Sequence, residues 1–269
     1  MNLLKKLLRN LRPLNIVQVT VSQIVYEKIF LGQHVLVTGG TSGIGLEIAK
    51  KFLSLGAKVT ITGRSIERLN AIKDEINNSN LIVVEWNISK INLIDEKVNE
   101  ILEKMGRIDI LINNSGIYAP NNFFNTDEKL FDEIMNTNLK GLFFTSKKIS
   151  EYFIKNSIKG KIINIGSVRS IQGGAEPYGI SKWGVRGLTQ GLARDLAKYG
   201  ITVNAVAPGM TATGINKINI QENAYSSASL DSRVATSEEI AEIVIFLSSN
   251  GANHIIGQTI VCDGGETLI

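Results

Sequence analysis

The sequence of 269 residues contains little cysteine and proline, and it lacks both a long apolar run and a strong excess of charge. Its single thiol, Cys262, cannot form an internal disulfide, which excludes a disulfide-stabilised scaffold and predicts a reducing, cytoplasmic location. No apolar run reaches the roughly 18 residues that a membrane-spanning helix needs. The absence of repeats, low-complexity tracts and Pro-rich linkers favours one domain over several.

The charge balance argues against nucleic acid as a partner. The 29 basic and 25 acidic residues give a formal net charge of +4, and the basic residues are spread along the chain. A dedicated nucleic-acid binder usually concentrates positive charge on one face or tract. The hydrophobic fraction of 43% and the charged fraction of 20% are ordinary for a globular protein. We predict no metal site.

The first residues form an N-terminal extension with its own pattern. Residues 1–11 read MNLLKKLLRNL, with leucines on one helical face and basic residues elsewhere, and Pro13 follows. This predicts a basic amphipathic helix that ends near Pro13 and does not resemble a secretory signal. Such a helix suits contact with an anionic membrane surface, but we favour packing against its own domain or a second subunit. We assign residues 1–31 to the extension and 32–269 to one domain.

From residue 33 onward, short β-branched runs alternate with longer stretches of helical periodicity. The predicted strands are residues 34–38, 58–62, 81–86, 108–113, 161–165, 202–206 and 259–261. Strands that alternate with helices form βαβ units, whose crossovers are right-handed. The sequence therefore predicts a single α/β domain with a Rossmann-like, doubly wound parallel sheet and helices on both faces.

A glycine-rich turn follows the first predicted strand. Residues 38–45 read TGGTSGIG and lead directly into a helical pattern. Glycine lets the backbone turn tightly and approach a pyrophosphate, and the helix N-terminus offers free N–H groups to the phosphates. The predicted cofactor contacts here are Gly39, Thr41, Ser42, Gly43, Ile44 and Gly45.

The end of the second predicted strand indicates which nicotinamide cofactor the chain prefers. Residues 61–65 read ITGRS and contain no carboxylate to bind a ribose 2′-hydroxyl. They contain Arg64, whose guanidinium can pair with a 2′-phosphate. We therefore favour NADP(H) over NAD(H).

Tyr178 and Lys182 are four residues apart in a predicted helix that runs to about Tyr199, which places both side chains on one helix face. A tyrosine alone has a pKa near ~10 and exchanges protons poorly at neutral pH. A nearby ammonium group favours the phenolate, so we expect Lys182 to lower the pKa of Tyr178. Taken alone the pair is weak evidence, since any helix produces this spacing by chance.

The order of several motifs strengthens the case. The glycine-rich turn, Asn113-Asn114-Ser115-Gly116, Asn138, Ser167, the Tyr178–Lys182 pair and Pro208-Gly209 follow one another along the chain. In this order the chain resembles the compact branch of the short-chain dehydrogenase/reductase family, over roughly residues 32–269. Further cofactor contacts that the resemblance implies are Asn87, Asn114, Gly116, Tyr178, Lys182, Pro208, Gly209, Thr211 and Thr213.

The resemblance implies four catalytic residues. Tyr178 would be the general acid and base, and Lys182 would hold the nicotinamide ribose. Ser167 would hydrogen-bond the substrate carbonyl, although it also suits a plain turn after a strand. Asn138 would support a water leading to Lys182. Asparagine is unfavourable inside a helical pattern, which favours a functional role for Asn138.

Three departures from the family pattern stand out. Ser115 replaces an alanine, which is a small change, and Asn87 replaces an aspartate near the adenine. The separation of Ser167 from Tyr178 is shorter than in many members. The short separation bears on the shape of the pocket between these two residues, but not on the helix that carries Tyr178.

Polar residues surround the predicted site and point to a small polar substrate such as a sugar, a nucleotide-sugar or a hydroxy acid. The candidate lining residues are Tyr118, Asn121, Asn122, Arg169, Gln172 and Glu176. One alternative is a 3-oxoacyl-[acyl-carrier-protein] reductase, for which Lys147, Lys148 and Arg194 would receive an acidic carrier. The other is a non-catalytic, cofactor-binding scaffold. The family also implies a homodimer or homotetramer, formed through residues 139–154 and 184–196.

Overall fold

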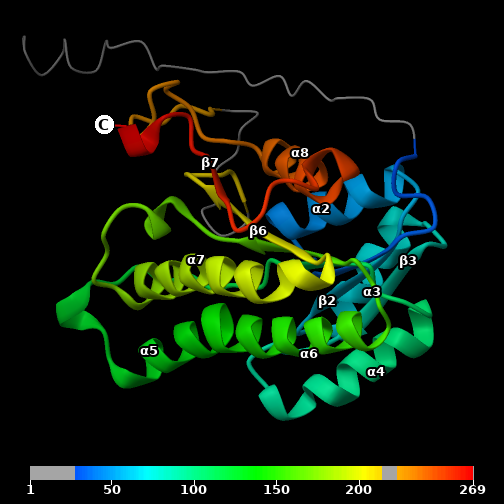
Figure 1. Cartoon of the computed structure of the whole chain (residues 1–269). Coiled ribbons are helices and arrows are strands. Elements are labelled where there is room, and N and C mark those ends of the chain that lie inside the picture. Colours follow the sequence, from blue (N-terminus) through cyan, green and yellow to red (C-terminus); the bar gives the residue numbers. More distant parts are fainter. Residues whose placement is uncertain (1–27, 214–222, 269) are drawn as a thin grey trace, which may run out of the picture.

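The computed structural model describes residues 28–213 and 223–268, so the helix predicted over residues 1–11 lies outside the described residues. One parallel sheet runs through the molecule in the order β3-β2-β1-β4-β5-β6-β7 (Figure 1). Its strands are β1 (His34–Thr38), β2 (Lys58–Gly63), β3 (Leu81–Glu85), β4 (Ile110–Asn113), β5 (Lys161–Ile165), β6 (Thr202–Pro208) and β7 (Thr259–Cys262). The predicted doubly wound sheet is confirmed, and its strand order reverses between β1 and β4.

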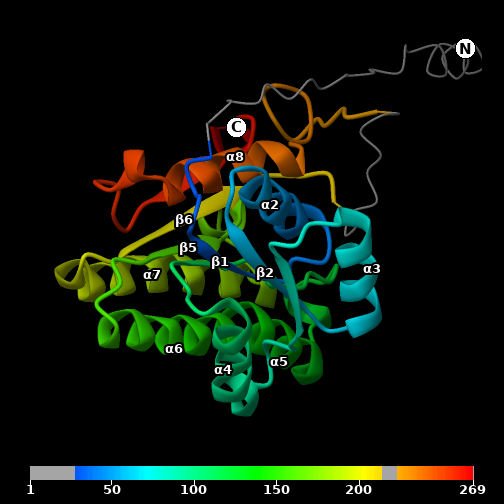
Figure 2. The ribbon, with the colours of Figure 1, turned by 90° about the vertical axis from the view of Figure 1, so that its right-hand side faces the viewer.

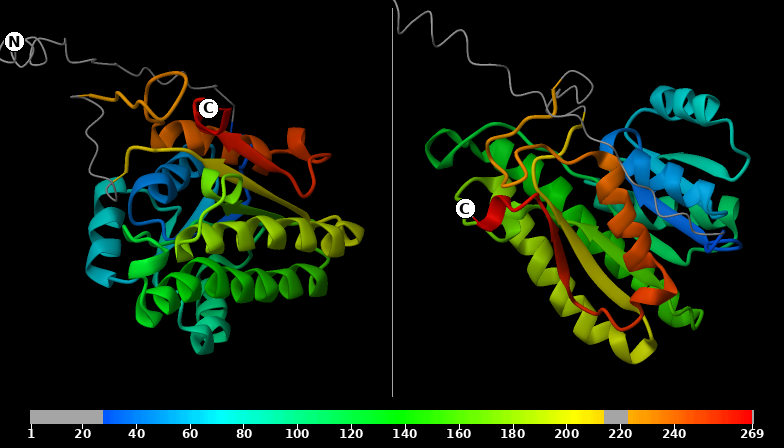
Figure 3. Two further views of the ribbon diagram at one scale, coloured as in Figure 1. Left: turned by 90° about the vertical axis from the view of Figure 1, so that its left-hand side faces the viewer. Right: turned by 90° about the horizontal axis from the view of Figure 1, so that it is seen from above.

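Helices cover both faces of the sheet. They are α2 (Gly43–Ser54), α3 (Ile66–Ile76), α4 (Ile94–Met105), α5 (Glu128–Met135), α6 (Leu142–Lys155), α7 (Pro177–Leu196) and α8 (Ser237–Ser248). Figures 1 and 2 show α2 and α8 on one side of the sheet and α4, α6 and α7 on the other. At the β6–β7 end, both strands lie between α8 and α7 (Figure 3). None of the described helices is long and apolar enough to cross a membrane.

The alternation of side chains along the strands builds two separate apolar cores. Val35 and Val37 of β1 belong to the core under α2 and α8, whereas Leu36 belongs to the core under α4, α6 and α7. Successive strand residues point to opposite faces, so one buried strand supplies both cores. Phe30 packs edge-on against Phe52 at a centroid distance of 4.8 Å, so the chain joins the first core ahead of β1.

Most predicted element boundaries agree with the structure to within two residues. The strand predicted from residue 108 begins at Ile110, and the strand predicted to end at residue 206 continues to Pro208. Pro177 occupies the first turn of α7, where its missing N–H has no helical partner to lose. The helix that we predicted to reach Tyr199 ends at Leu196 and continues as a 3-10 turn.

A buried chain of amides and hydroxyls fixes the central strands to the helices beside them. Asn113 Nδ2 donates to Asn164 Oδ1 and to Ser146 Oγ, each at 2.9 Å. Asn164 Nδ2 in turn donates to Thr189 Oγ1 at 2.9 Å. These four residues are buried, so water cannot reach their polar groups. The hydrogen bonds between them supply the partners that water would otherwise provide. The chain therefore links β4 and β5 to α6 and α7.

Replacing Asn164 with Ala should lower the free energy of unfolding by about 2 to 4 kcal/mol, because the amide of Asn113 and the hydroxyl of Thr189 lose a partner away from water. Urea unfolding of the full chain measures this change. The exposed Asn70→Ala is the matched control and should change stability by less than about 0.5 kcal/mol. Equal stability of both variants would show that the chain of hydrogen bonds contributes nothing.

Candidate active site

The glycine-rich turn presents an open helix N-terminus at the carboxyl edge of the sheet. Ser42 is the N-cap of α2, but its side chain makes no capping hydrogen bond, and the first turn contains no acidic residue. The free N–H groups and the helix dipole therefore suit an anion. A Cβ on Gly45 would lie 2.5 Å from the Gly39 carbonyl oxygen, and Gly39 has a φ of +68°. Both positions need glycine, and the turn fits a bound pyrophosphate.

Asn114 holds this turn against the end of β4. Its Nδ2 donates to the Gly39 carbonyl at 2.8 Å and to the Thr38 carbonyl at 3.2 Å. Thr38 Oγ1 accepts hydrogen bonds from the backbone N–H of Asn114 at 3.1 Å and of Ser115 at 3.2 Å. Ser115, which replaces the usual alanine, therefore fits without disturbing the turn. The side chain of Asn114 therefore fixes the backbone of the glycine-rich turn.

The segment after β6 reaches the same turn. Thr211 Oγ1 donates to the Gly209 carbonyl at 3.0 Å, directly after Pro208. A Cβ on Gly43 would lie 3.1 Å from Thr213 Cγ2, so Thr213 covers the start of α2. Asn87 lies apart from this cluster in the sequence, and its Oδ1 accepts hydrogen bonds within its own turn, from the N–H and hydroxyl of Ser89.

Two arginines follow β2 beside the glycine-rich turn, in the segment where the sequence predicts that the ribose 2′-phosphate binds. Arg64 is exposed just after β2, as the sequence predicts for a phosphate ligand. Arg68 on α3 donates from Nε to the Thr41 carbonyl of the glycine-rich turn at 3.1 Å. Arg68 is not among the predicted cofactor contacts. Its sequence signal is its position three residues after Ser65, the N-cap of α3, which puts it in the first turn of the helix that follows Arg64.

Ser167, Tyr178 and Lys182 meet at the carboxyl end of β5. Tyr178 lies in the first turn of α7, close enough to the Ser167 hydroxyl for that group to lower the pKa of the phenol. Lys182 Nζ donates to the Ile165 carbonyl at 2.8 Å and lies 5.6 Å from the centroid of the Tyr178 ring. The three predicted reactive side chains therefore share one site, and Ser167 also caps the turn that follows β5 through Arg169 N–H at 3.2 Å.

Asn138 is buried in a π-helical segment, Asn136–Gly141, between α5 and α6. Its Oδ1 accepts from the Ile117 N–H at 2.8 Å and its Nδ2 donates to the Ile117 carbonyl at 2.9 Å. A Cβ on Gly116 would lie 3.5 Å from Asn138 Oδ1 and 3.8 Å from Lys182 Nζ. Asn138 thus fixes the chain after β4 beside Lys182. The water that the resemblance implies stays a prediction.

Burial dominates the acid–base properties of the pair. Desolvation lowers the pKa of Lys182 to about 8. Burial raises the pKa of Tyr178, while the hydrogen bond from Ser167 acts in the opposite direction. The expected lowering of the Tyr178 pKa by Lys182 is therefore not found here, because the ammonium group lies over the ring and bonds to Ile165. A protonated phenol suits proton donation during a reduction.

Charged and aromatic groups surround the phenol. Tyr118 packs edge-on against Tyr178 at a centroid distance of 5.2 Å. Arg169, with 48% of its side chain exposed, lies 3.9 Å from Glu176. The positive charge of Arg169 lowers the pKa of Tyr178 and the negative charge of Glu176 raises it, so both charges act on the phenol.

The loop that follows β4 differs from the prediction. Asn121 Nδ2 donates to Thr126 Oγ1 at 2.7 Å, and Asn122 caps a short 3-10 turn through the N–H groups of Phe124 and Asn125. Both asparagines therefore build the loop rather than present free amides to a substrate. The same loop exposes Phe123 and Phe124, the latter to 94%, which the sequence does not predict because aromatic residues in a loop carry no periodic signal.

Comparisons with known proteins agree with this geometry. The family model described as short chain dehydrogenase matches residues 33–224. The 3-oxoacyl-[acyl-carrier-protein] reductase FabG of Buchnera aphidicola subsp. Acyrthosiphon pisum is 38% identical, over 88% of this chain and 98% of its own. The gluconate 5-dehydrogenase of Gluconobacter oxydans is 32% identical, over 88% and 95%.

Two solved structures share both the fold and part of the sequence of this chain. The 3-ketoacyl-(acyl-carrier-protein) reductase from Brucella melitensis complexed with NADH has a TM-score of 0.81 and 29% identity, covering 88% of this chain and 99% of its own. ElxO with NADP bound has a TM-score of 0.82 and 32% identity at the same coverage.

Replacing Lys182 with Met should stabilise the cofactor-free protein at pH 7. The pKa of Lys182 falls from 10.5 to about 8 on folding, which corresponds to roughly 3 kcal/mol, and the unpaired Ile165 carbonyl offsets about 1 to 2 kcal/mol. Between pH 8 and pH 10.5, unfolding of the wild type takes up a proton, so its stability rises with pH and the advantage of the variant shrinks.

Urea unfolding of both proteins at several pH values measures this difference. The exposed Lys155→Met serves as control and should show no such dependence. A difference between wild type and Lys182→Met that stays constant from pH 7 to pH 10 would contradict the assignment of a desolvated ammonium group.

Proposed function

Because the chain belongs to the short-chain dehydrogenase/reductase family, we propose that it is an NADP(H)-dependent oxidoreductase that interconverts a ketone and a secondary alcohol on a small polar substrate. The observation that carries the proposal is the convergence of Ser167, Tyr178 and Lys182 at the carboxyl edge of the sheet. In a doubly wound fold this edge, at the reversal of strand order, is where ligands bind.

In this proposal the protein supplies position and a proton. The bound nicotinamide supplies the hydride. Ser167 hydrogen-bonds the substrate carbonyl, and Tyr178 donates its phenolic proton to the oxygen that becomes the alcohol. Lys182, held by the Ile165 carbonyl, contacts the nicotinamide ribose. In the oxidative direction the same groups act in reverse.

Arg64 and Arg68 support the preference for NADP(H). Neither β2 nor the turn after it ends in a carboxylate. Arg68 is already hydrogen-bonded to the Thr41 carbonyl of the glycine-rich turn. A guanidinium binds a phosphate through paired hydrogen bonds that a ribose hydroxyl cannot match. The related structures include both a complex with NADH and one with NADP, so the preference rests on these two side chains.

Arg169 supports a polar, preferably anionic substrate. It follows Ser167 by two residues, lies near Tyr178 and keeps about half of its side chain exposed. Two relatives are named gluconate 5-dehydrogenase and glucose 1-dehydrogenase, and gluconate and glucose are both small polar molecules. The basic patch that a carrier protein would need is weakened, because Lys148 pairs with Asp95 at 2.5 Å and Lys147 lies 3.8 Å from Glu151.

A 3-oxoacyl-[acyl-carrier-protein] reductase is the second candidate. Relatives with this name reach 38% identity. The exposed rings of Phe123 and Phe124 offer apolar surface near the site, on the loop that also carries Tyr118, and an acyl chain would bury it. This surface is the observation that favours a longer, less polar substrate.

We also propose that the protein forms a homodimer or homotetramer through the helices predicted for this role. The outer side of α7, the π-helical segment Asn136–Gly141 and the start of α6 form an apolar groove. It is lined by Leu139, Phe143, Gly184, Gly187 and Leu188. A Cβ on Gly187 would meet nothing within 4 Å, so a second helix has room to approach this face.

A substrate screen tests the proposed reaction. Oxidation of NADPH should be seen with polar ketones such as keto-sugar acids, and the Tyr178→Phe variant should lose at least about 100-fold in kcat while still binding NADPH. Turnover of only 3-oxoacyl thioesters would sink the polar assignment in favour of the second candidate. No loss in Tyr178→Phe, or no turnover of any ketone, would favour a non-catalytic scaffold.

The cofactor preference has its own test. The double substitution of Arg64 and Arg68 by Ala should weaken NADPH binding by about 10- to 100-fold and leave NADH binding within about threefold. Fluorescence titration with both nucleotides measures these affinities. Arg107→Ala, at the opposite edge of the sheet, is the control. An equal loss for both nucleotides would show that the arginines support the turn but do not recognise a 2′-phosphate.

A further inference from the structure

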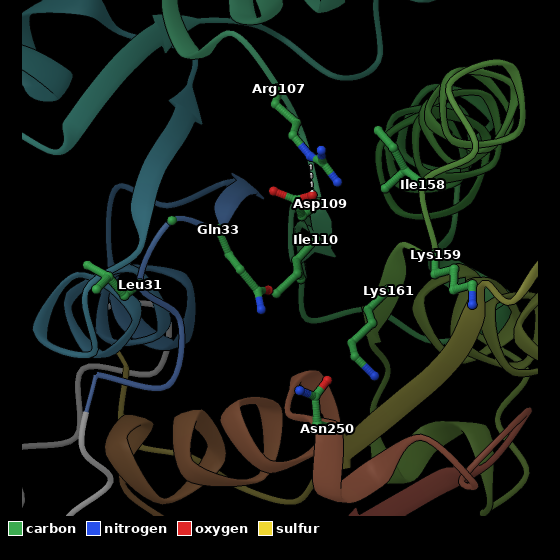
Figure 4. Close-up of a pocket in the computed structure, with 10 residues that line it drawn as sticks. Leu31, Gln33, Arg107, Asp109, Ile110, Ile158, Lys159, Lys161 and Asn250 are labelled. Carbon is green, nitrogen blue, oxygen red and sulfur yellow. Dashed lines mark hydrogen bonds and ion pairs between the residues drawn. The ribbon is translucent and has the colours of Figure 1, made fainter.

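A cavity of about 430 Å³ lies at the amino-terminal edge of the sheet, opposite the reactive side chains (Figure 4). Its walls come from the segments that precede β1, β4 and β5 and from the turn after α8. Nothing in the proposed oxidoreductase reaction uses this edge. The volume falls within the range of small-molecule sites.

The charges in this cavity do not balance. Asp109 is the acidic lining residue, and it is engaged by Arg107 Nε at 2.5 Å and by the His34 N–H at 3.0 Å. The remaining charged lining residues, Lys159 and Lys161, make no ion pair with any described carboxylate. Two positive charges therefore face the cavity without a counter-ion among the described residues.

Lys161 is the more unusual of the two because it is buried. It begins β5 and keeps only 9% of its surface exposed, at a position where a central strand normally carries an apolar side chain. Its ammonium group donates to the neutral Asn253 Oδ1 at 2.6 Å, and desolvation lowers its pKa. A buried cation with only a neutral partner is costly, and an anion in the cavity would remove that cost.

The rest of the lining suits a molecule larger than an inorganic ion. Gln33 and Asn250 bring carboxamide groups, and Figure 4 shows Lys161 reaching toward Asn250. Leu31 is the exposed apolar residue of the lining, whereas Ile110 and Ile158 are buried behind it in the core. The volume leaves room for a carbon skeleton beside the polar groups, as in sites for organic ligands.

We propose that this cavity binds a small organic phosphate, whose dianion pairs with Lys159 and Lys161 and whose carbon skeleton occupies the remaining volume of the cavity. A phosphate monoester carries close to two negative charges at neutral pH, which matches the two unpaired ammonium groups. It also accepts more hydrogen bonds than one carboxylate, and lysine binds phosphate as a compact point charge. The site is distinct from the cofactor turn, since it lies at the other end of the strands.

Calorimetric titration of the full chain with glycerol 3-phosphate tests the proposal. We expect saturable binding, weakened about tenfold or more by Lys159→Met and by Lys161→Met, because each removes a charge-assisted bond. The exposed Lys90→Met is the matched control and should bind like the wild type. A phosphate bound at the cofactor turn would survive both lysine substitutions, so binding that both variants retain would overturn the proposal.

The single Lys159 variant and two further probes, succinate and inorganic phosphate, complete the experiment. Lys159 is exposed, so its variant folds even if the substitution of buried Lys161 disturbs the sheet. Succinate offers the same charge without a phosphate, and tighter binding of succinate would overturn the assignment to phosphate. Inorganic phosphate should bind more weakly than glycerol 3-phosphate because it leaves most of the cavity unfilled. The absence of saturable binding for every probe would also overturn the site.

Discussion

The hydrogen bonds from Asn114 to the carbonyls of Thr38 and Gly39 hold together the two halves of the site. They lie where the strand order reverses, so β1 and β4 lead away to opposite sides and open a crevice between them. On one side Asn114 fixes the turn that begins α2. On the other, Gly116 lies against Asn138 and Lys182, two positions further along the same chain. A shift of this short segment would therefore move the cofactor turn and the reactive lysine together.

The π-helical segment Asn136–Gly141 extends this arrangement to α7. An i to i+5 turn widens the helix by one residue, and such segments are frequent at functional sites. Here the widened turn carries Asn138, whose side chain bonds to both backbone groups of Ile117 and to Ser181 Oγ at 3.3 Å. One amide thus connects the end of β4 with the helix that carries Tyr178. The cost of a poor helix former is offset by three buried hydrogen bonds.

The sequence predicts the features that depend on local rules. Strand alternation and the glycine-rich turn determine the sheet and its ligand edge, and the spacing of Tyr178 and Lys182 places them together. Other features depend on tertiary contacts that no local pattern encodes. Arg68 reaches Thr41 from another βα unit, and the amide group of Asn121 donates to Thr126 within its own loop. The pKa of Tyr178 follows from burial, which the chain acquires only when α7 packs against β5.

Two desolvated lysines mark the two ends of β5, and they show how differently a fold can accommodate a buried charge. At the carboxyl end, Lys182 bonds to the carbonyl of Ile165 and lies over an aromatic ring, so its cost is partly offset by the protein itself. At the amino end, Lys161 donates a hydrogen bond to the neutral amide of Asn253 and lines an open cavity. Neither lysine pairs with a carboxylate among the described residues. A salt bridge would stabilise either ammonium group but would also neutralise it, and an uncompensated charge is what a ligand can recognise. One charge, on α7 at the carboxyl end of β5, therefore lies in the proposed reactive site, and the other, at the start of β5, lies in the proposed phosphate site.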